Sequence, residues 1–439
     1  MKISAILAAV ENGGFDKTFV SLYRDTVRPR ARYGKLLADF LERYGDREGL
    51  LFSVPGRTEI SGNHTDHNNG CVLAASVDID IIAVAAKTEG MTVRIKSEGY
   101  PEDTVDCTSP DPKKVRKGSS SALVTGICDA FARKGYAFGG FDACTSSDVL
   151  TGSGLSSSAA FEVMCARIMS QLYNEGKVPP MELAMAGQYA ENVYFGKPCG
   201  LMDQAACACG GFLYIDFEDP ASPKTEKLSL DPEKSGYTFC IVNTGGNHVD
   251  LTDDYAAVPK EMHACAALMG KKVLRECDEA EFVSRISYMR ANVGDRAILR
   301  ALHYFGENKR VEAQRAALKG GDADTFFRLV TESGRSSFEF LQNVFTTRNV
   351  SEQGISLALA LSERFGAVCR VHGGGFAGTI QAYVPTANVE AYREAINNVF
   401  GKNACMLLRI RPYGASVVDQ SGVKESIADT ARVLSRMYD

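Results

Sequence analysis

Residues 151–163 read TGSGLSSSAAFEV, and this glycine- and serine-rich stretch restricts the fold more than any other. Gly152 and Gly154 allow the backbone to approach a ligand closely, and a run of good helix formers begins at Ala159. Such a loop leaves free backbone N–H groups at the positive end of a helix, where they bind an anion such as phosphate. A helix start that is merely capped by serine is the alternative.

The loop is not a Walker A motif. That motif needs a glycine five residues before a Gly-Lys pair, and none of the Gly-Lys pairs meets this condition; they stand at 34–35, 176–177, 196–197, 270–271 and 401–402. A P-loop NTPase is therefore excluded.

A second glycine-rich stretch, VHGGGFAGTIQAYV, satisfies G-x-G-x-x-G with Gly373, Gly375 and Gly378. A dinucleotide-binding fingerprint must open a helix, whereas TIQAYV is strand-like, so we expect a loop between two strands and no nicotinamide cofactor. Protein kinases do use a glycine loop between strands, but the chain has no H-R-D or D-F-G motif. A tight hairpin without a ligand is the alternative.

The chain of 439 residues is too long for one compact core, so we expect two domains. The polar, proline-bearing stretch at 218–236 is the best boundary, which gives domains 1–230 and 231–439. Strand-like and helical patterns are mixed without strict βα alternation, which predicts an α+β fold. Expected helices include the first ten residues, two helices over 17–45 separated at Pro29, and helices at 156–174, 181–195 and 202–208.

Composition limits the partners. The net charge is −5 and the densest basic run, DPKKVRKG, opens with an aspartate, so we expect no nucleic-acid partner. No run of about 18 apolar residues exists to cross a bilayer, so no membrane partner is expected. The 13 cysteines are an odd number in largely apolar contexts, which indicates reduced thiols and a cytoplasmic protein.

Residues 54–70, VPGRTEISGNHTDHNNG, hold two of the six histidines beside an arginine and three asparagines. Turn chemistry explains the glycines and asparagines but not the arginine and the histidines, which indicate a functional segment. A solvated loop without a function is the alternative. A metal site built on His64-x-x-His67 would have only two close ligands.

Two carboxylates lie between the glycine loops, Glu191 in a helix and Asp203 at the start of the next helix. A helix cap explains a carboxylate at such a start equally well. Phosphoryl transfer needs one carboxylate to hold Mg²⁺, one to receive a hydroxyl proton and a cation to stabilise the moving charge. Glu191, Asp203 and Arg57 are candidates for these three roles.

Four motifs together resemble the galactokinases, in the superfamily that also contains homoserine, mevalonate and phosphomevalonate kinases. They are the signature at 56–70, GLSSSA at 154–159, CGLMDQ at 199–204 and GGGFAG at 373–378, all in the order found in that family. The resemblance covers nearly the whole chain. It implies an N-terminal domain like the second domain of ribosomal protein S5 and a ferredoxin-like C-terminal domain.

The resemblance also implies an ATP-dependent sugar 1-kinase of galactose metabolism, with ATP and a sugar as its small-molecule partners. ATP would lie on Gly152, Ser153, Gly154, Leu155, Ser156, Ser157 and Ser158, with Gly374 and Gly375. Ser158 and Glu191 would ligate Mg²⁺, and Asp203, beside Arg57, would act as the base. The sugar pocket would be lined by Asn63, His64, Asp66, Gly200 and Tyr255. A monomer is the expected state.

The signature departs from the family pattern G-E-H-T-D-Y, because Asn63 replaces the glutamate and His67 the tyrosine. A glutamate about 4 Å from a sugar carboxylate would repel it by about 4 kcal/mol at an effective dielectric near 20. Asn63 removes that repulsion but serves a neutral hydroxyl equally well. Galactose is therefore the expected substrate, with galacturonate as the alternative and a non-catalytic sugar and ATP sensor as the second.

Overall fold

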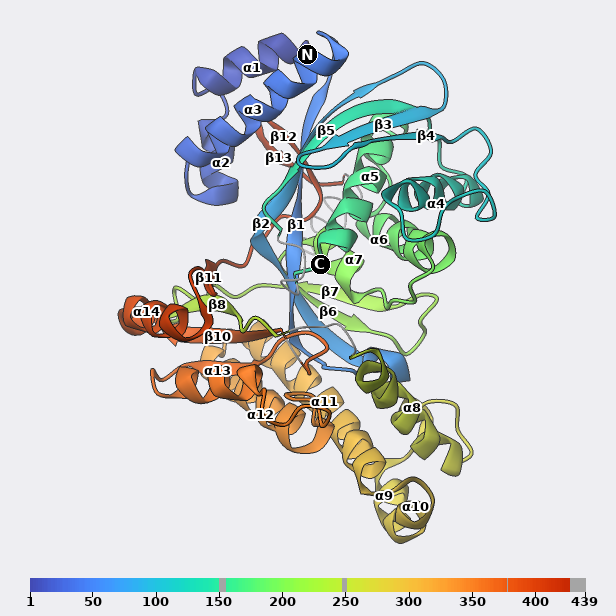
Figure 1. Cartoon of the computed structure of the whole chain (residues 1–439), viewed down its shortest axis with the longest axis vertical. Coiled ribbons are helices and arrows are strands. Elements are labelled where there is room, and N and C mark those ends of the chain that lie inside the picture. Colours follow the sequence, from blue (N-terminus) through green and yellow to red (C-terminus); the bar gives the residue numbers. More distant parts are fainter. Residues whose placement is uncertain (150–154, 247–250, 377, 427–439) are drawn as a thin grey trace.

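A computed structural model describes residues 1–149, 155–246, 251–376 and 378–426. Two sheets with helices packed on them form the molecule (Figure 1), and the predicted α+β class is confirmed. The larger sheet has nine strands in the order β13-β12-β1-β2-β5-β3-β4, with β6 paired to β2 and β7 to β6. These strands are β1 (Leu50–Ser61), β2 (Cys71–Lys87), β3 (Thr92–Ser97), β4 (Glu102–Asp106), β5 (Phe141–Ser147), β6 (Phe212–Asp216), β7 (Lys224–Leu228), β12 (Ser416–Asp419) and β13 (Gly422–Lys424).

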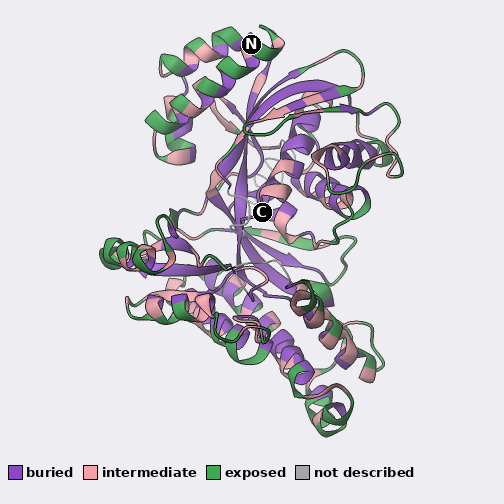
Figure 2. Cartoon of the chain, in the orientation of Figure 1, coloured by how far each residue is buried: buried purple, intermediate pink, exposed green. Residues whose placement is uncertain are grey.

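The long strand β2 is buried on both faces (Figure 2), which explains its nearly continuous apolar sequence CVLAASVDIDIIAVAAK. Ile82 and Val84 face the first three helices, whereas Ile81 and Ala83 face the main core on the other side. This period of two is what a strand requires when both faces are covered. The sheet is therefore the middle layer of the larger half.

Helices cover the two faces of this sheet separately (Figure 1). One face carries α1 (Ile3–Glu11), α2 (Asp16–Tyr23) and α3 (Val27–Tyr44); the other carries α4 (Ser120–Arg133), α5 (Ser157–Tyr173), α6 (Pro180–Tyr189), the π-helical turn η2 (Ala190–Phe195) and α7 (Met202–Cys209). The expected break at Pro29 is wrong. The chain breaks at Arg24, which is left-handed, and Pro29 is accommodated in the first turn of α3 because the first helical N–H groups have no partner within the helix.

The second sheet has four antiparallel strands in the order β11-β8-β10-β9. In chain order this arrangement is 4-1-3-2, the ferredoxin-like order implied by the resemblance. Its strands are β8 (Tyr237–Asn243), β9 (Val368–Val371), β10 (Thr379–Pro385) and β11 (Cys405–Leu408). The second glycine loop joins β9 to β10, which pair as an antiparallel hairpin, so the expectation of a loop between two strands is confirmed.

Helices of the second half follow β8 and β10 in the chain. They are α8 (Thr252–Leu268), the 3₁₀ turn η3 (Leu274–Glu276), α9 (Glu279–Ser284), α10 (Ile286–Val293), α11 (Asp295–Gly320), α12 (Ala323–Ser336), the π-helical turn η4 (Ser337–Leu341), α13 (Gly354–Glu363), the 3₁₀ turn η5 (Thr386–Asn388) and α14 (Val389–Phe400). The chain then returns to the larger sheet, where β12 pairs with β1 and Val417 lies opposite Phe52.

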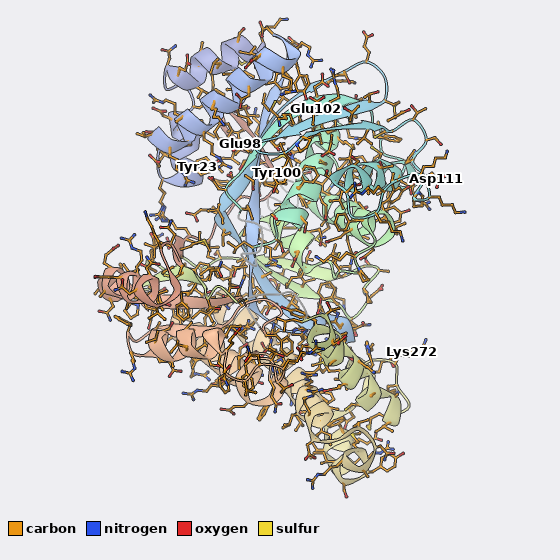
Figure 3. The ribbon with its side chains drawn as sticks, viewed as in Figure 1. Tyr23, Glu98, Tyr100, Glu102, Asp111 and Lys272 are labelled. Atoms are coloured by element: carbon orange, nitrogen blue, oxygen red, sulfur yellow. The ribbon has the colours of Figure 1, made fainter. Side chains whose placement is uncertain are left out.

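A buried ion cluster holds the returning C-terminal segment against the larger sheet. Asp80 in β2 is 0% exposed and pairs with Arg32 of α3 at 2.5 Å and with Arg411 at 3.2 Å. Tyr23 of α2, labelled in Figure 3, donates a 2.6 Å hydrogen bond to the same carboxylate. A carboxylate with no water access is stable only when it is paired and hydrogen-bonded in this way. Within the described residues, no helix has the length and apolar character needed to cross a membrane.

Candidate active site

The signature at 54–70 begins as a strand, not as a loop. Arg57 to Ser61 belong to β1, and only 62–70 turns back toward β2, through the 3₁₀ turn η1 (Asp66–Asn68). Gly62 is required at the turn, because its φ is +95° and a Cβ would lie 2.6 Å from Cys71 O. The β-branched and apolar residues on either side of the turn continue the sheet, which the turn-rich composition concealed.

Arg57 and Asp203 meet although they lie 146 residues apart in the chain. Arg57 extends from β1, and Asp203 stands in the first turn of α7. Arg57 Nε donates to Asp203 Oδ1 and Nη2 donates to Oδ2, both at 2.6 Å. Burial raises the pKa of Asp203, but Arg57 and Ser156 outweigh it and hold the pKa below the usual value. The carboxylate is therefore ionised, and with 31% of its side chain exposed it is reachable by a ligand.

The described part of the serine loop packs on this pair. Leu155 is buried, and its carbonyl accepts a 3.2 Å hydrogen bond from Arg57 N. Ser156 has a left-handed backbone with φ of +56°, and its Oγ donates to Asp203 Oδ2. Ser157 and Ser158 follow in the first turn of α5 and are half-buried. Gly152, Ser153 and Gly154 lie outside the described residues.

Glu191 lies in η2 and is 3% exposed. Gln204, the residue after Asp203, donates from Nε2 to Glu191 Oε2 at 3.0 Å and to Glu162 Oε2 at 2.9 Å. Burial, reinforced by the neighbouring Glu191, raises the pKa of Glu162 to about 9. The exposed Lys197 approaches Glu191 Oε1 at 3.4 Å. Gln204 and Glu162 had no assigned role in the sequence analysis, although both stand inside or beside its motifs.

The second glycine loop contacts the sugar signature through its carbonyl oxygens. Asn63 Nδ2 donates to Gly373 O at 2.7 Å, and His64 Nε2 donates to Gly374 O at 2.9 Å. Tyr255 of α8 donates to Gly375 O at 2.9 Å. The structure thus brings residues of 63–64, 255 and 373–375 together.

Asp66 and Gly200 also touch. A Cβ on Gly200 would lie 2.5 Å from Asp66 Oδ2, so only glycine permits this approach. Gly200 is three residues before Asp203 in the chain, and the contact therefore links the signature to the start of α7.

One face of α11 forms hydrogen bonds with the backbone of 62–71, and no motif in the sequence predicted these contacts. His303 Nε2 donates to Asn63 O at 2.9 Å, and Tyr304 donates to Asn68 O at 2.9 Å. Glu307 Oε1 accepts from Gly62 N at 2.9 Å, and Asn308 Oδ1 accepts from Cys71 N at 2.8 Å. The only available signal was polar residues at helical spacing in HYFGEN, which an exposed helix face would show equally well.

The side chain of Asn63 is hydrogen-bonded to neighbouring residues on all sides. Its amide donates to Glu59 Oε1 at 2.8 Å as well as to Gly373 O, and its Oδ1 accepts from Asn343 Nδ2 at 2.6 Å. Glu59 is itself paired with the fully buried Arg370 at 3.1 Å. Both amide hydrogens of Asn63 are therefore committed within the protein.

No cluster of three or more His, Cys, Asp or Glu side chains suited to a metal ion occurs among the described residues. The rings of His64 and His67 are 5.9 Å apart, and His64 Nε2 is bound to Gly374 O. The structure therefore lends no support to a metal site on His64-x-x-His67.

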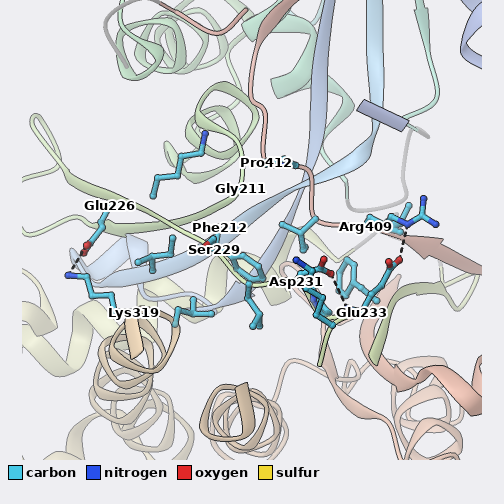
Figure 4. A pocket seen from close by; sticks show the side chains of 18 of the residues that line it. Gly211, Phe212, Glu226, Ser229, Asp231, Glu233, Lys319, Arg409 and Pro412 are labelled. Atoms are coloured by element: carbon cyan, nitrogen blue, oxygen red, sulfur yellow. Dashed lines mark hydrogen bonds and ion pairs between the residues drawn. The ribbon is translucent and has the colours of Figure 1, made fainter. Parts of the chain in front are cut away.

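A separate cleft of about 800 Å³ lies where β7, α11 and β11 come together (Figure 4). Phe212, Leu228 and Leu408 supply apolar walls, and the ion pairs Glu226–Lys319 and Glu233–Arg409 stand at its rim. None of the residues described above as part of the candidate site lines this cleft.

Comparison with known proteins agrees with this geometry. The model of the GHMP kinases N-terminal domain matches residues 122–211, and the galactokinase galactose-binding signature matches residues 38–87. A galactokinase of Streptomyces coelicolor is 30% identical over 367 residues, which cover 82% of this chain and 91% of that protein. A galactokinase of Actinobacillus pleuropneumoniae is 30% identical over 369 residues, which cover 83% and 92%.

The fold agrees as well. The crystal structure of Lactococcus lactis galactokinase complexed with galactose superposes with a TM-score of 0.73 at 26% identity, covering 86% of this chain and 98% of that one. A mevalonate kinase structure, at 15% identity, shares the fold with a TM-score of 0.58 and covers 82% of this chain and 99% of its own. The chain therefore belongs to the galactokinase family of the GHMP kinases and is an ATP-dependent sugar kinase of that type.

Proposed function

We propose that the protein transfers the γ-phosphoryl group of ATP to the anomeric hydroxyl of galactose. The observation that carries this proposal is the bidentate Arg57–Asp203 pair beside the serine loop, with Arg57 on a strand that lies within the galactose-binding signature at 38–87. The named galactokinase relatives support galactose as the sugar.

In the proposed reaction, the sugar oxygen attacks the γ-phosphorus while the bond from that phosphorus to the β-γ bridging oxygen breaks and ADP leaves. The hydroxyl proton passes to a carboxylate oxygen of Asp203. A carboxylate with a lowered pKa is a weak base, so it orients the hydroxyl and receives the proton late, as the phosphoryl group departs from ADP. Arg57 holds Asp203 ionised and carries a positive charge to the reacting centre. No covalent enzyme intermediate is needed.

Ser158 and Glu191 are the proposed ligands of Mg²⁺. A hydroxyl and a carboxylate oxygen are the kind of donors that Mg²⁺ takes, with the rest of its shell supplied by phosphate and water. The exposed Lys197 approaches Glu191 Oε1 at 3.4 Å, and two buried oxygens without a hydrogen-bond partner among the described residues, Glu162 Oε1 and Gln204 Oε1, belong to side chains next to Glu191, which supports a cation at this position. When bound, Mg²⁺ neutralises charge on the ATP phosphates.

The proposed phosphate cradle is 152–158, together with Gly374 and Gly375. The start of α5 supports the first part, since Ser156, the residue before the helix, bonds to Asp203 and the positive helix end therefore lies near that carboxylate. For Gly374 and Gly375 the support is the motif, because their carbonyl oxygens are bonded to His64 and Tyr255. Gly374 and Gly375 would therefore bind a phosphate through their backbone N–H groups.

The proposed sugar pocket is lined by His64, Asp66, Gly200 and Tyr255, with Asn63 in its wall. Asn63 has no amide hydrogen left for a sugar carboxylate, and Glu59 places a carboxylate one hydrogen bond behind it. The carboxylate that the family pattern has at position 63 is thus replaced by one at position 59, where Glu59 is paired with Arg370. This arrangement supports a neutral sugar, and no observation favours galacturonate.

The test is to incubate the purified protein with Mg-ATP and galactose, galacturonate or N-acetylgalactosamine and to follow ADP release. We expect galactose to be preferred at least tenfold in kcat/KM, and ³¹P NMR to detect an anomeric phosphate monoester. A preference for galacturonate would contradict the claim that the surroundings of Asn63 support a neutral sugar. No ADP above background with any of the three would contradict the proposal.

We also propose that the chain divides near residue 230. The larger sheet's β7 ends at Leu228 and the second sheet's β8 begins at Tyr237, which supports this boundary. The returning strands β12 and β13 would then be a C-terminal addition to the N-terminal domain.

A further inference from the structure

Two buried oxygen atoms beside Glu191 lack a hydrogen-bond partner among the described residues. They are Glu162 Oε1 and Gln204 Oε1, and both side chains are 0% exposed. Buried acceptors of this kind are normally satisfied by protein, ordered water or an ion. Their position beside the proposed metal ligand suggests what satisfies them.

Glu162 shares a helix face with Ser158. It follows Ser158 by four residues in α5, one helical turn later, so both side chains stand on the same side of the helix. Gln204 Nε2 bridges Glu162 and Glu191 with hydrogen bonds of 2.9 and 3.0 Å. The proposed ligands Ser158 and Glu191 are thereby connected through Glu162 and Gln204.

The bridge has little room to rearrange. A Cβ on Gly187 of α6 would lie 3.1 Å from Glu162 Cβ and 3.2 Å from Gln204 Cγ, so the helix backbone packs directly on both side chains. No lysine or arginine of the described chain forms an ion pair with Glu162; Arg57 is paired with Asp203 and Lys197 with Glu191. The ionised form of such a buried carboxyl group is costly unless a cation joins it.

We infer that Glu162 and Gln204 are positioning residues of the magnesium site, which orient Glu191 and accept hydrogen bonds from water molecules that the ion retains. Mg²⁺ gives up its waters reluctantly and usually keeps several of them when it binds a protein. Residues that hold such waters and ligands typically change metal affinity 10- to 100-fold when mutated. The inference rests on the proposed role of Glu191 as a metal ligand.

The test uses Glu162→Gln in the full-length protein, since glutamine keeps the shape and cannot ionise when a cation binds. We expect the Kd for Mg-ADP, measured by calorimetry, to rise about 10- to 100-fold, while the Kd for ADP in EDTA stays within twofold. Binding of Mn²⁺ in the presence of ADP, followed by electron paramagnetic resonance, should weaken in parallel. Glu182→Gln is the matched control, because it removes a carboxylate of α6 that pairs with the exposed Lys134.

An unchanged Kd for Mg-ADP in folded Glu162→Gln protein would overturn the inference. If that variant does not fold, Gln204→Met removes the bridging amide at similar size, and the same loss of Mg-ADP affinity is expected. Glu191→Gln separates the two proposals. If it abolishes the effect of Mg²⁺ on ADP binding and Glu162→Gln does not, only the inference fails; if neither variant alters that effect, the metal ligand itself is misassigned.

Discussion

The sugar side and the metal side of the site are built differently. On the sugar side, the backbone of 62–71 is held by four side chains of one face of α11, and its turn is closed by Thr65. On the metal side, Glu162 and Gln204 each keep a buried oxygen without a hydrogen-bond partner in the part of the chain that the structure describes. The backbone of the first surface is held by hydrogen bonds from the protein itself, whereas the two acceptors of the second are placed to receive hydrogen bonds from a hydrated cation.

This difference separates the effects of mutation. Damage to the sugar side should lower the stability of the free protein, because bonds already made are lost. Damage to the metal side should lower ligand affinity and leave the free protein as stable as before.

The largest effect is expected at Asp203, which stands between the two sides. Asp203→Asn should lower kcat by about 10²- to 10⁴-fold, because the amide cannot receive the sugar proton. ADP binding in EDTA should change little, which calorimetry can check. Asp39→Asn, on the exposed face of α3, is the control and should retain full activity. Substantial turnover by Asp203→Asn would remove the base from the mechanism.

A matched pair of glutamates tests the comparison directly. In Glu307, burial raises the pKa, but Arg310 and neighbouring cations outweigh it and lower the pKa to about 2. Ionised Glu307 therefore stabilises the fold, and Glu307→Gln should reduce the free energy of unfolding by about 3 kcal/mol. Glu162→Gln should cost nothing, because burial raises the pKa of Glu162 to about 9, so that the side chain is already uncharged in the free protein at neutral pH. Urea unfolding of both variants without ligand is the measurement; equal losses would erase the distinction between the two sides.

Acid should weaken the sugar side first. Burial, helped by His67, lowers the pKa of His64 to about 4, whereas an unfolded histidine titrates near 6.5. Between these two pH values the unfolded chain binds more protons, so this contribution to stability is complete above about pH 6.5 and shrinks as pH falls toward 4. At pH 5 about 2 kcal/mol should be lost from this group. Unfolding curves at pH 7 and 5 should show a smaller decrease for His64→Gln than for the natural sequence.

The smallest effect is expected for Gly200→Ala. Its new methyl group would meet Asp66 Oδ2, and moving that carboxylate should raise KM for galactose about tenfold, which is about 1.4 kcal/mol. The KM for ATP should stay constant. Gly34→Ala in α3 is the control, because a Cβ there meets nothing within 4 Å. A change in the KM for ATP alone would contradict the assignment of Gly200 to the sugar pocket.

Local patterns predicted much of the fold. The hairpin around the second glycine loop and the helix starts at the serine loop and at Asp203 follow from glycine, β-branched and helix-forming residues close in sequence. The meeting of Arg57 with Asp203 came from motif resemblance, since no local rule links residues 146 positions apart.

The remainder depends on contacts that only the folded chain defines. His303 reaches Asn63 across 240 residues, and nothing near either residue indicates the partner. The motif indicates Asn63 as a substrate contact, because the sequence does not reveal its hydrogen bonds to Glu59 and Asn343. For Glu162 the sequence indicates only a place within a helix, because a buried carboxylate is recognised from its surroundings in the folded chain.

The return of the last strands to the first sheet has a consequence for biosynthesis. Phe52 in β1 acquires its outer neighbour Val417, and Asp80 acquires Arg411, only after nearly the whole polypeptide has been translated. Until then the nascent N-terminal half exposes an open sheet edge and an incompletely neutralised buried acid. Ribosome-bound fragments that stop before residue 411 should therefore depend on chaperones, and the first half should consolidate after release.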